Sequence, residues 1–307
     1  MASGSITRLP DFIGLGPPRT GTTWLHGLLK GHVDLPYGVK ETQFFTTFYS
    51  KGIEWYQHHF RYATGERKVA EICPYFNTMK APARIHRHLP DCKFLVTFRN
   101  PVEHAYSTYK MLVRGAFVRG TFDEVLNQRP NIDDGNRYAK QLRAWFDHFD
   151  RERFLIMRYE ELRDDPQDYL DRVCDFIGTA RISIPDDGTG QRRANSIERA
   201  PKSRKLAQNA RHLRYRLKRR HAYGLIRAMG RTGIWDFCNG RGEIFPALSP
   251  EKKAMLAERY LPEVEALEEL LKLDFSDWKR SDAVPREASA IDAGRGSFRY
   301  ASGLTGR

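Results

Sequence analysis

Four short hydrophobic runs are spaced along the first half of the chain, and amphipathic segments separate them. The first run is continuous, apolar and followed by a turn rich in Gly and Pro, which is typical of a strand buried inside a parallel sheet. Strands that alternate with helices favour an α/β fold. The four predicted strands cover residues 12–16, 69–72, 94–98 and 154–157.

Helix signals lie between these strands and continue after the last one. Thr residues at the start of the first helix are expected to cap it, Thr121 has capping-box spacing to Glu124, and Pro262 is expected to bend or interrupt the last helix. The pattern predicts a single-domain α/β fold with a P-loop-like parallel β-sheet flanked by helices. The predicted helices lie at 22–30, 82–89, 102–114, 138–149 and 168–177, and further helices begin at 121 and 249.

The other segments define the expected domain organisation. One domain is predicted over residues 1–279. Within it, residues 179–195 are a polar linker, and the densely basic stretch 199–221 belongs to a basic helical lid or insert at about 195–245. Residues 280–307 are rich in Ser, Ala, Gly and Arg and are expected to form a flexible C-terminal tail.

The charge balance points to an anionic partner. The chain has 51 Lys and Arg residues against 38 Asp and Glu, a formal net charge of +13. A phosphorylated cofactor, an acidic substrate, nucleic acid or a membrane face would each suit this charge, and so would a simply solvated basic surface.

The cysteines and the N-terminus bear on the compartment. The four cysteines form no C-x-x-C pair and have no His at zinc-site spacing, so we expect reduced, packed thiols. Residues 1–10 lack the apolar centre of a secretory signal, and no apolar run is long enough to span a bilayer. We therefore expect a cytoplasmic protein.

A Gly-rich turn joins the first predicted strand to the first predicted helix. Glycines let the backbone approach an anion, and the helix start offers N–H groups and partial positive charge. The spacing matches a Walker A loop, but Thr22 stands where that loop has Lys, which disfavours ATP or GTP chemistry. A smaller anion, such as a 5′-phosphate with a leaving group, remains suitable; the alternative is a simple connecting turn. The candidate binding residues are Arg19, Thr20, Gly21, Thr22 and Thr23.

A second candidate anion site follows the third predicted strand. Arg99 stands at the end of that strand, where α/β sheets place ligands, and Ser107 lies in the next helix. An Arg fork with a hydroxyl suits a monophosphate. Two such sites at adjacent strand ends would suit a nucleotide with phosphates on both 3′ and 5′ positions; a structural salt bridge is the alternative for Arg99.

Several separate blocks of this sequence form a recognisable set: 17–25, 40–45, 98–101 with Ser107 and Tyr109, 158–162 and 274–278. These blocks resemble the sulfotransferases that depend on 3′-phosphoadenosine-5′-phosphosulfate (PAPS), in particular their heparan-sulfate and bacterial-type branch. The blocks keep the family order and together cover roughly residues 11–279.

The resemblance implies a nucleotide-binding role for the matching residues. The loop from Arg19 to Thr23 would bind the 5′-phosphosulfate, and Trp24 would face the adenine. Arg99 and Ser107 would hold the 3′-phosphate. A late basic segment would close over the nucleotide, and its candidates are Lys202, Ser203 and Arg204.

The resemblance also implies the chemistry. Glu41 would be the general base, which takes a proton from an acceptor hydroxyl or amine during in-line sulfuryl transfer. Arg19 would stabilise the charge on the departing adenosine 3′,5′-bisphosphate. No metal is required. Lys40 would either contact the sulfuryl oxygens or be a solvated surface lysine.

Two positions depart from the family pattern. The family usually has Lys where this chain has Arg19, and Arg keeps the charge but cannot give up a proton at neutral pH. In the heparan-sulfate branch a Lys follows the Glu of the second strand, whereas Ile72 follows Glu71 here. This disfavours a polymer-type acceptor. A small molecule, a glycoside or a lipid stays open as the acceptor, and the oligomeric state is not readable.

Two other functions compete with this interpretation. A P-loop small-molecule kinase would need a Walker-type Lys and a Mg²⁺-binding carboxylate. A basic nucleic-acid-binding protein is suggested by residues 211–220, where Arg and Lys alternate with His and Tyr. The same stretch suits an amphipathic helix or a lid, which we favour, so no nucleic-acid partner is expected.

Overall fold

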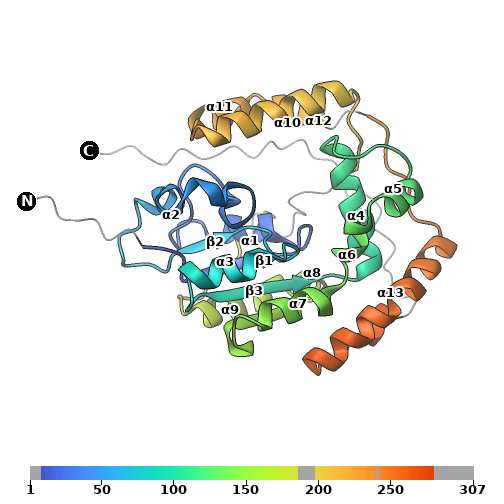
Figure 1. Cartoon of the computed structure of the whole chain (residues 1–307), viewed down its shortest axis with the longest axis horizontal. Helices are drawn as coiled ribbons and strands as arrows, with labels where there is room; N and C mark the ends of the chain where they lie inside the picture. Colours follow the sequence, from blue (N-terminus) through green and yellow to red (C-terminus); the bar gives the residue numbers. More distant parts are fainter. Residues whose placement is uncertain (1–7, 186–197, 240–241, 280–307) are drawn as a thin grey trace, which may run out of the picture. The chain divides into compact units, whose positions relative to one another are not determined.

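The computed structural model describes most of the chain, and the described part divides into two units (Figure 1). The described residues are 8–185, 198–239 and 242–279. Unit 1 comprises residues 8–109, 120–185 and 248–279 among these, and unit 2 comprises 110–119, 198–239 and 242–247. The predicted flexible tail at 280–307 and the linker residues 186–195 lie outside the described residues.

A parallel sheet forms the centre of unit 1. Among the described residues it has four strands in the order β2-β1-β3-β4, and every neighbouring pair is parallel. The strands are apolar and almost entirely buried, as expected for a sheet covered on both faces. They are β1 (Phe12–Gly16), β2 (Ala70–Ile72), β3 (Lys93–Phe98) and β4 (Phe154–Arg158).

The order of the strands creates a switch point. The chain leaves β1 to form β2 on one side and then returns to form β3 on the other side of β1. Open α/β sheets bind ligands beyond the carboxyl ends of strands at such a point. The register between β1 and β3 shifts between Gly14 and Gly16, just before the Gly-rich turn.

Helices cover both faces of this sheet. The helices of unit 1 are α1 (Thr22–Leu29), α2 (Ile53–Gln57), α3 (Ala81–His88), α4 (Pro101–Arg114, whose last residues belong to unit 2), α5 (Phe122–Gln128), α6 (Pro130–Asp134), α7 (Tyr138–Phe146), α8 (Tyr159–Asp164), α9 (Pro166–Ile177), α13 (Pro250–Leu271) and α14 (Ser276–Lys279). Single turns of other helix types occur at η1 (Phe44–Phe48), η2 (Tyr49–Lys51), η3 (His58–Phe60) and η4 (Arg151–Arg153).

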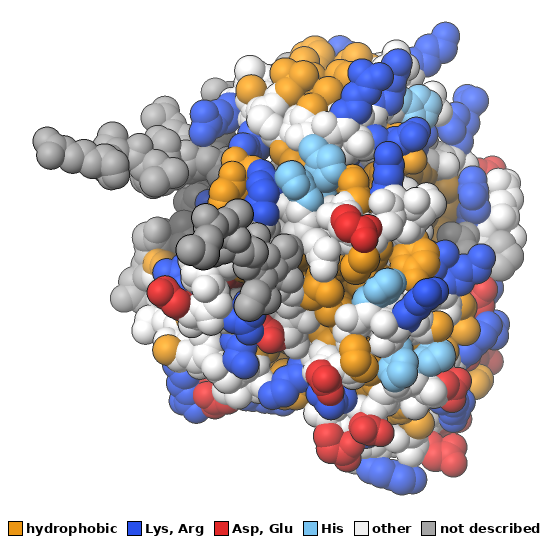
Figure 2. Space-filling view, turned by 60° about the vertical axis from the view of Figure 1, so that its left-hand side comes forward, with side chains coloured by type: hydrophobic (Ala, Val, Ile, Leu, Met, Phe, Trp, Pro, Cys, Tyr) orange, Lys and Arg blue, Asp and Glu red, His pale blue; other side chains and the backbone are white. Residues whose placement is uncertain are grey.

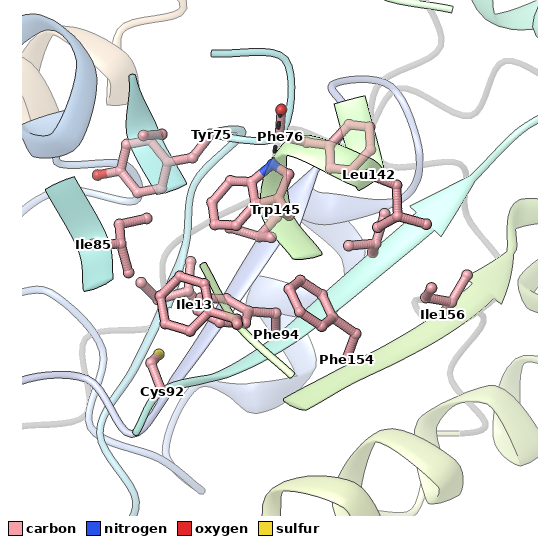
Figure 3. Close-up of a cluster of buried hydrophobic side chains, with 14 of the residues drawn as sticks. Ile13, Tyr75, Phe76, Ile85, Cys92, Phe94, Leu142, Trp145, Phe154 and Ile156 are labelled. Atoms are coloured by element: carbon pink, nitrogen blue, oxygen red, sulfur yellow. Dashed lines mark hydrogen bonds between the residues drawn. The ribbon is translucent and has the colours of Figure 1, made fainter. Parts of the chain in front are cut away.

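One face of the sheet packs against α3, α7 and α13. Successive strand residues point to opposite faces, so Ile13, Phe94 and Phe154 turn to this side and meet Trp145 of α7. The Trp145 indole Nε1 donates to the Phe76 carbonyl at 3.1 Å, which satisfies the polar atom of this buried ring (Figure 3).

The opposite face packs against α1 and α9. Phe12, Leu95 and Met157 turn to this side and join side chains such as Leu25 and Leu170 in a second buried cluster. Helix α1, which follows the Gly-rich turn, is therefore held against the sheet by its own apolar side.

The structure confirms the predicted parallel α/β fold, with helix ends shifted by a few residues. The capping box at α5 is present: Glu124 N donates to Thr121 Oγ1, and Thr121 N donates to the Glu124 carboxylate. All four cysteines are free and buried. The sequence predicted a single domain with an insert at about 195–245; the structure separates residues 198–239 and 242–247, with 110–119, as unit 2.

Of the two effects predicted for Pro262, a bend or an interruption, the interruption is wrong, because α13 runs through this residue without a break. A proline inside a helix removes one hydrogen bond and costs about 3 kcal/mol. Pro262 is on the exposed side, while Leu256 and Tyr260 before it and Val264 and Leu267 after it are buried. The continuous apolar side outweighs the cost of the proline.

Unit 2 is helical and basic. Its helices are α10 (Arg204–Arg219), α11 (Tyr223–Arg231) and α12 (Ile234–Asn239). Helix α10 packs against the other two and buries Ala207 and Ala210. Arg211 lies over the Phe117 ring at 4.3 Å and donates to the Gly115 carbonyl at 3.0 Å. Lys and Arg side chains lie beside exposed hydrophobic ones at the top of the face in Figure 2.

No helix in the described part of the chain combines the length and the apolar character needed to cross a bilayer.

Candidate active site

Two glycines shape the turn between β1 and α1. Gly16 and Gly21 have φ values of 86° and 85°, in the left-handed region. A Cβ at Gly16 would lie 3.3 Å from the Pro74 Cα, and a Cβ at Gly21 would collide with the Leu162 side chain. Glycine adopts this conformation without strain and leaves the necessary space. The backbone therefore folds into a tight loop at the carboxyl end of β1.

Helix α1 begins at this loop without a side-chain cap. Its N-cap is Gly21, which has no side chain to accept bonds from the first N–H groups, so the predicted Thr cap is wrong. The Thr20 hydroxyl instead donates to the Pro17 carbonyl at 2.8 Å and holds the loop itself together. An anion at this end of α1 would meet backbone N–H groups and the positive end of the helix dipole.

A hydrogen bond joins the two predicted anion sites. Arg19 has a φ of 72°, and its Nε donates to the Ser107 Oγ of α4 at 3.0 Å. Ser107 is only 5% exposed. The two strands that precede these sites, β1 and β3, are direct neighbours. The structure thus brings together Arg19, predicted to bind the 5′-phosphosulfate, and Ser107, predicted to bind the 3′-phosphate.

Arg99 lies directly after β3 in a salt bridge. Its Nε and Nη2 donate to Glu103 Oε2 at 3.0 and 2.7 Å, and its guanidinium lies 4.8 Å from the centre of the Tyr159 ring. The two paired side chains are 16% and 19% exposed. The structural alternative considered for Arg99 is thus present, and a phosphate at this position would share the guanidinium with Glu103.

Lys40 and Glu41 lie beside the N-terminal turn of α1. Lys40 Nζ donates to Thr23 Oγ1 at 3.0 Å, to Thr22 Oγ1 at 3.4 Å and to Glu41 Oε1 at 2.9 Å. The Lys40 and Glu41 side chains are 26% and 28% exposed, so the pair remains open to solvent. Burial and then the charge of Lys40 lower the pKa of His26, on α1, to about 4. The Lys40 ammonium therefore lies between the predicted base, Glu41, and the hydroxyls at the start of α1.

A buried carboxylate on β2 holds the residue that follows Glu41. Glu71 is 0% exposed and accepts hydrogen bonds from the Thr42 N–H at 2.9 Å, the Thr42 hydroxyl at 2.7 Å, the Tyr56 hydroxyl at 2.7 Å and the Tyr75 hydroxyl at 3.2 Å. Burial raises the pKa of Glu71, and these hydrogen bonds oppose the rise. The sequence analysis missed this role, although a Glu inside an apolar strand was the available signal.

A buried histidine supports the loop from the other side. In His104 of α4, Nε2 lies 2.8 Å from the Pro18 carbonyl and Nδ1 lies 2.6 Å from Asn136 Oδ1. Burial lowers the pKa of His104 to about 4, against the effect of both contacts. The sequence analysis missed His104 as well, because nothing in its local pattern connects it to the loop.

Comparison with known proteins identifies the family. A family profile described as a sulfotransferase domain matches residues 9–214. The chain belongs to the PAPS-dependent sulfotransferase family. Human heparan sulfate glucosamine 3-O-sulfotransferase 3B1 is 34% identical over 191 residues, 59% of this chain and 49% of that protein. Xenopus laevis bifunctional heparan sulfate N-deacetylase/N-sulfotransferase 1 is 27% identical over 195 residues, 56% of this chain and 22% of that protein.

The structural comparison agrees on the fold of this family member. A solved sulfotransferase from Alicyclobacillus acidocaldarius has a TM-score of 0.64 and 23% identity, and the match covers 89% of this chain and 100% of that one. This likeness concerns the fold. The chain spans about half or less of the length of the curated relatives named above.

Neither competing function is favoured by these comparisons. The kinase interpretation needed a Walker-type Lys, and the nucleic-acid interpretation rested on the basic stretch that forms most of α10. The described residues contain no group of three or more His, Cys, Asp or Glu side chains placed to hold a metal ion.

Trp24 occupies a largely buried position in this sulfotransferase-family fold. Its side chain is 9% exposed, and its ring meets Tyr169 of α9 edge-on at 6.0 Å. The ring thus belongs to the cluster that attaches α1 to the sheet. A contact between Trp24 and adenine stays a prediction.

The late basic segment lies in unit 2. Ser203 is the N-cap of α10 and accepts from the Leu206 N–H at 3.3 Å, while Lys202 and Arg204 are exposed. The capping bond gives Ser203 a local structural role. Nucleotide binding by Lys202, Ser203 and Arg204 stays a prediction.

Proposed function

We propose that this chain transfers the sulfuryl group of PAPS to a hydroxyl or amine of a small-molecule, carbohydrate or lipid acceptor. The observation that carries the proposal is the hydrogen bond that connects the two proposed anion sites. The loop follows β1 and Arg99 follows the neighbouring strand β3, and Arg19 of the loop bonds Ser107 of α4 at 3.0 Å. This arrangement suits a nucleotide with phosphates at both ends of its ribose.

Each residue has a defined part in the proposed reaction. PAPS supplies a sulfuryl group that is already attached to a leaving phosphate. Glu41 accepts the proton of the acceptor as its oxygen or nitrogen bonds to sulfur. The bridging S–O bond breaks, and its electron pair stays on the 5′-phosphate. Arg19 and the loop N–H groups stabilise the charge that develops there.

Ligand-dependent stability tests the proposal. Adenosine 3′,5′-bisphosphate without metal should raise the melting temperature, because a ligand at 100 times its dissociation constant stabilises a protein by about 2.7 kcal/mol. Mg-ATP should have no such effect; the reverse result would favour a kinase. Incubation with sulfur-labelled PAPS and separate small-molecule, carbohydrate and lipid pools would then identify the acceptor. The names of the curated relatives make glucosamine-containing saccharides a natural first carbohydrate pool.

A further inference from the structure

The Lys40 ammonium lies at the start of α1, where a Walker loop would provide its own lysine. In a Walker loop the lysine stands at the position of Thr22. Here the Lys40 ammonium reaches Thr22 and Thr23, at the first turn of α1, from a segment that follows the helix. An ammonium has three N–H donors, and Lys40 directs them to three oxygens: two hydroxyls and the Glu41 carboxylate.

Arg19, the other cation of the loop, already uses its Nε in a hydrogen bond to Ser107 of α4. Ile72, which follows Glu71 on β2, is apolar and buried and supplies no cation here. Lys40 is therefore well placed to meet a sulfuryl group at the start of α1.

The same ammonium restrains the proposed base. Lys40 Nζ lies 2.9 Å from Glu41 Oε1, so this carboxylate oxygen is already occupied by a donor and is not directed to an acceptor. Lysine is a compact charge on a flexible stem, so it can change partners without moving the backbone. The bonds between Thr42 and Glu71 keep the adjacent backbone in place during such a change.

We propose that Lys40 is a catalytic cation that exchanges partners when PAPS binds. This inference rests on the proposed function. Without PAPS, Lys40 neutralises Glu41. With PAPS, its N–H groups turn to the sulfuryl oxygens and release Glu41 Oε1 toward the acceptor. Lys40 keeps all its protons: the acceptor proton goes to Glu41, and the electron pair of the broken S–O bond goes to the 5′-phosphate. The base thus becomes available only after PAPS has bound.

Binding of PAPS and of the bisphosphate product separates this role from a structural one. Only PAPS carries the sulfuryl group. In Lys40→Met, calorimetry without acceptor should show PAPS affinity reduced about tenfold, the loss expected for charged hydrogen bonds, and bisphosphate affinity unchanged. The turnover number should fall by about 10²–10³-fold. Lys40→Arg should recover part of both, and exposed Lys51→Met should match the original protein.

Each other outcome has a definite meaning. Unchanged PAPS affinity and turnover in Lys40→Met would overturn the inference. Equal losses of PAPS and bisphosphate affinity would also overturn it, because they would make Lys40 a structural residue. If the unaltered protein bound neither nucleotide, the proposed function itself would fail, whatever the variants did.

Discussion

Glu41 precedes Thr42 in the sequence and Glu71 accepts hydrogen bonds from it, but the two carboxylates have different surroundings. Glu41 is 28% exposed, and its partner Lys40 is also partly open to solvent. Glu71 is fully buried, and every hydrogen bond to its carboxylate comes from Thr42, Tyr56 or Tyr75 in the described structure. A group that moves a proton must be reachable by its substrate, whereas a group that fixes geometry needs a closed set of donors. The same side chain thus serves as a candidate base in one place and as a support in the other.

The largest expected effect tests Glu41, the carboxylate that solvent can reach. Glu41→Gln keeps the shape and removes the basic oxygen, so turnover should fall by about 10²–10⁴-fold, the usual contribution of a general base. Affinity for adenosine 3′,5′-bisphosphate should be unchanged, as measured by calorimetry. Normal turnover in this variant would remove Glu41 from the mechanism.

The next expected effect is a pH dependence of the free energy of unfolding that comes from the buried His104. The pKa of His104 is lowered from 6.5 to about 4 in the folded protein. The unfolded chain therefore binds the proton more readily, so the stability from neutral His104 is complete above pH 6.5 and is lost as the pH falls toward 4. The loss amounts to about 3 kcal/mol.

Urea unfolding of the original protein and of His104→Gln at several pH values measures this effect. The variant should lose about 3 kcal/mol less between pH 7 and pH 4, because it has no imidazole to protonate. Parallel stability curves for the two proteins would show that His104 titrates normally.

A smaller effect tests the far end of the nucleotide site. Arg99→Ala should weaken binding of adenosine 3′,5′-bisphosphate by about 30-fold, as expected for charge-assisted hydrogen bonds worth about 2 kcal/mol. Adenosine 5′-phosphosulfate lacks the 3′-phosphate, so its affinity should change little. Equal losses for both nucleotides would mean that Arg99, with Glu103, only shapes the strand end.

The smallest effect tests the link between the two carboxylates. Thr42→Val removes the hydroxyl that donates to Glu71 and keeps the backbone bond and the volume. The free energy of unfolding should fall by about 1–2 kcal/mol, because the hydroxyl both donates to Glu71 and accepts from the Phe44 N–H at 3.1 Å. Turnover should fall more than bisphosphate affinity, since Glu41 lies next to the altered residue. A lower affinity with normal turnover would contradict the positioning role of Thr42.

The sequence allowed the sheet and the Gly-rich loop between β1 and α1 to be predicted because their signals are local, while phosphate binding by this loop stays a prediction. The apolar run before Gly16 and the glycines around the loop depend on neighbouring residues alone. The adjacency of Arg19 and Ser107 also followed, since both predicted sites were expected at adjacent ends of parallel strands.

The supports of the site could not be predicted in this way. Lys40 contacts Thr22 and Thr23 because the intervening chain folds back, and Glu71, 29 residues beyond Thr42, helps to hold that fold. His104 meets the loop through a contact spanning 86 residues. The division into two units, which adds residues 110–119 to the basic helices, likewise depends on contacts between distant segments.

The direct pairing of β1 and β3 sets the distance between the two strand ends that precede the proposed anion sites. Neighbouring strands are about 4.8 Å apart, and backbone hydrogen bonds keep this spacing constant. The loop follows β1 directly and Arg99 follows β3 directly, so the sheet fixes the spacing at which the two proposed anion sites begin. If both sites bind phosphate as proposed, a ligand with one phosphate, or with two at a different spacing, is expected to engage only one of them.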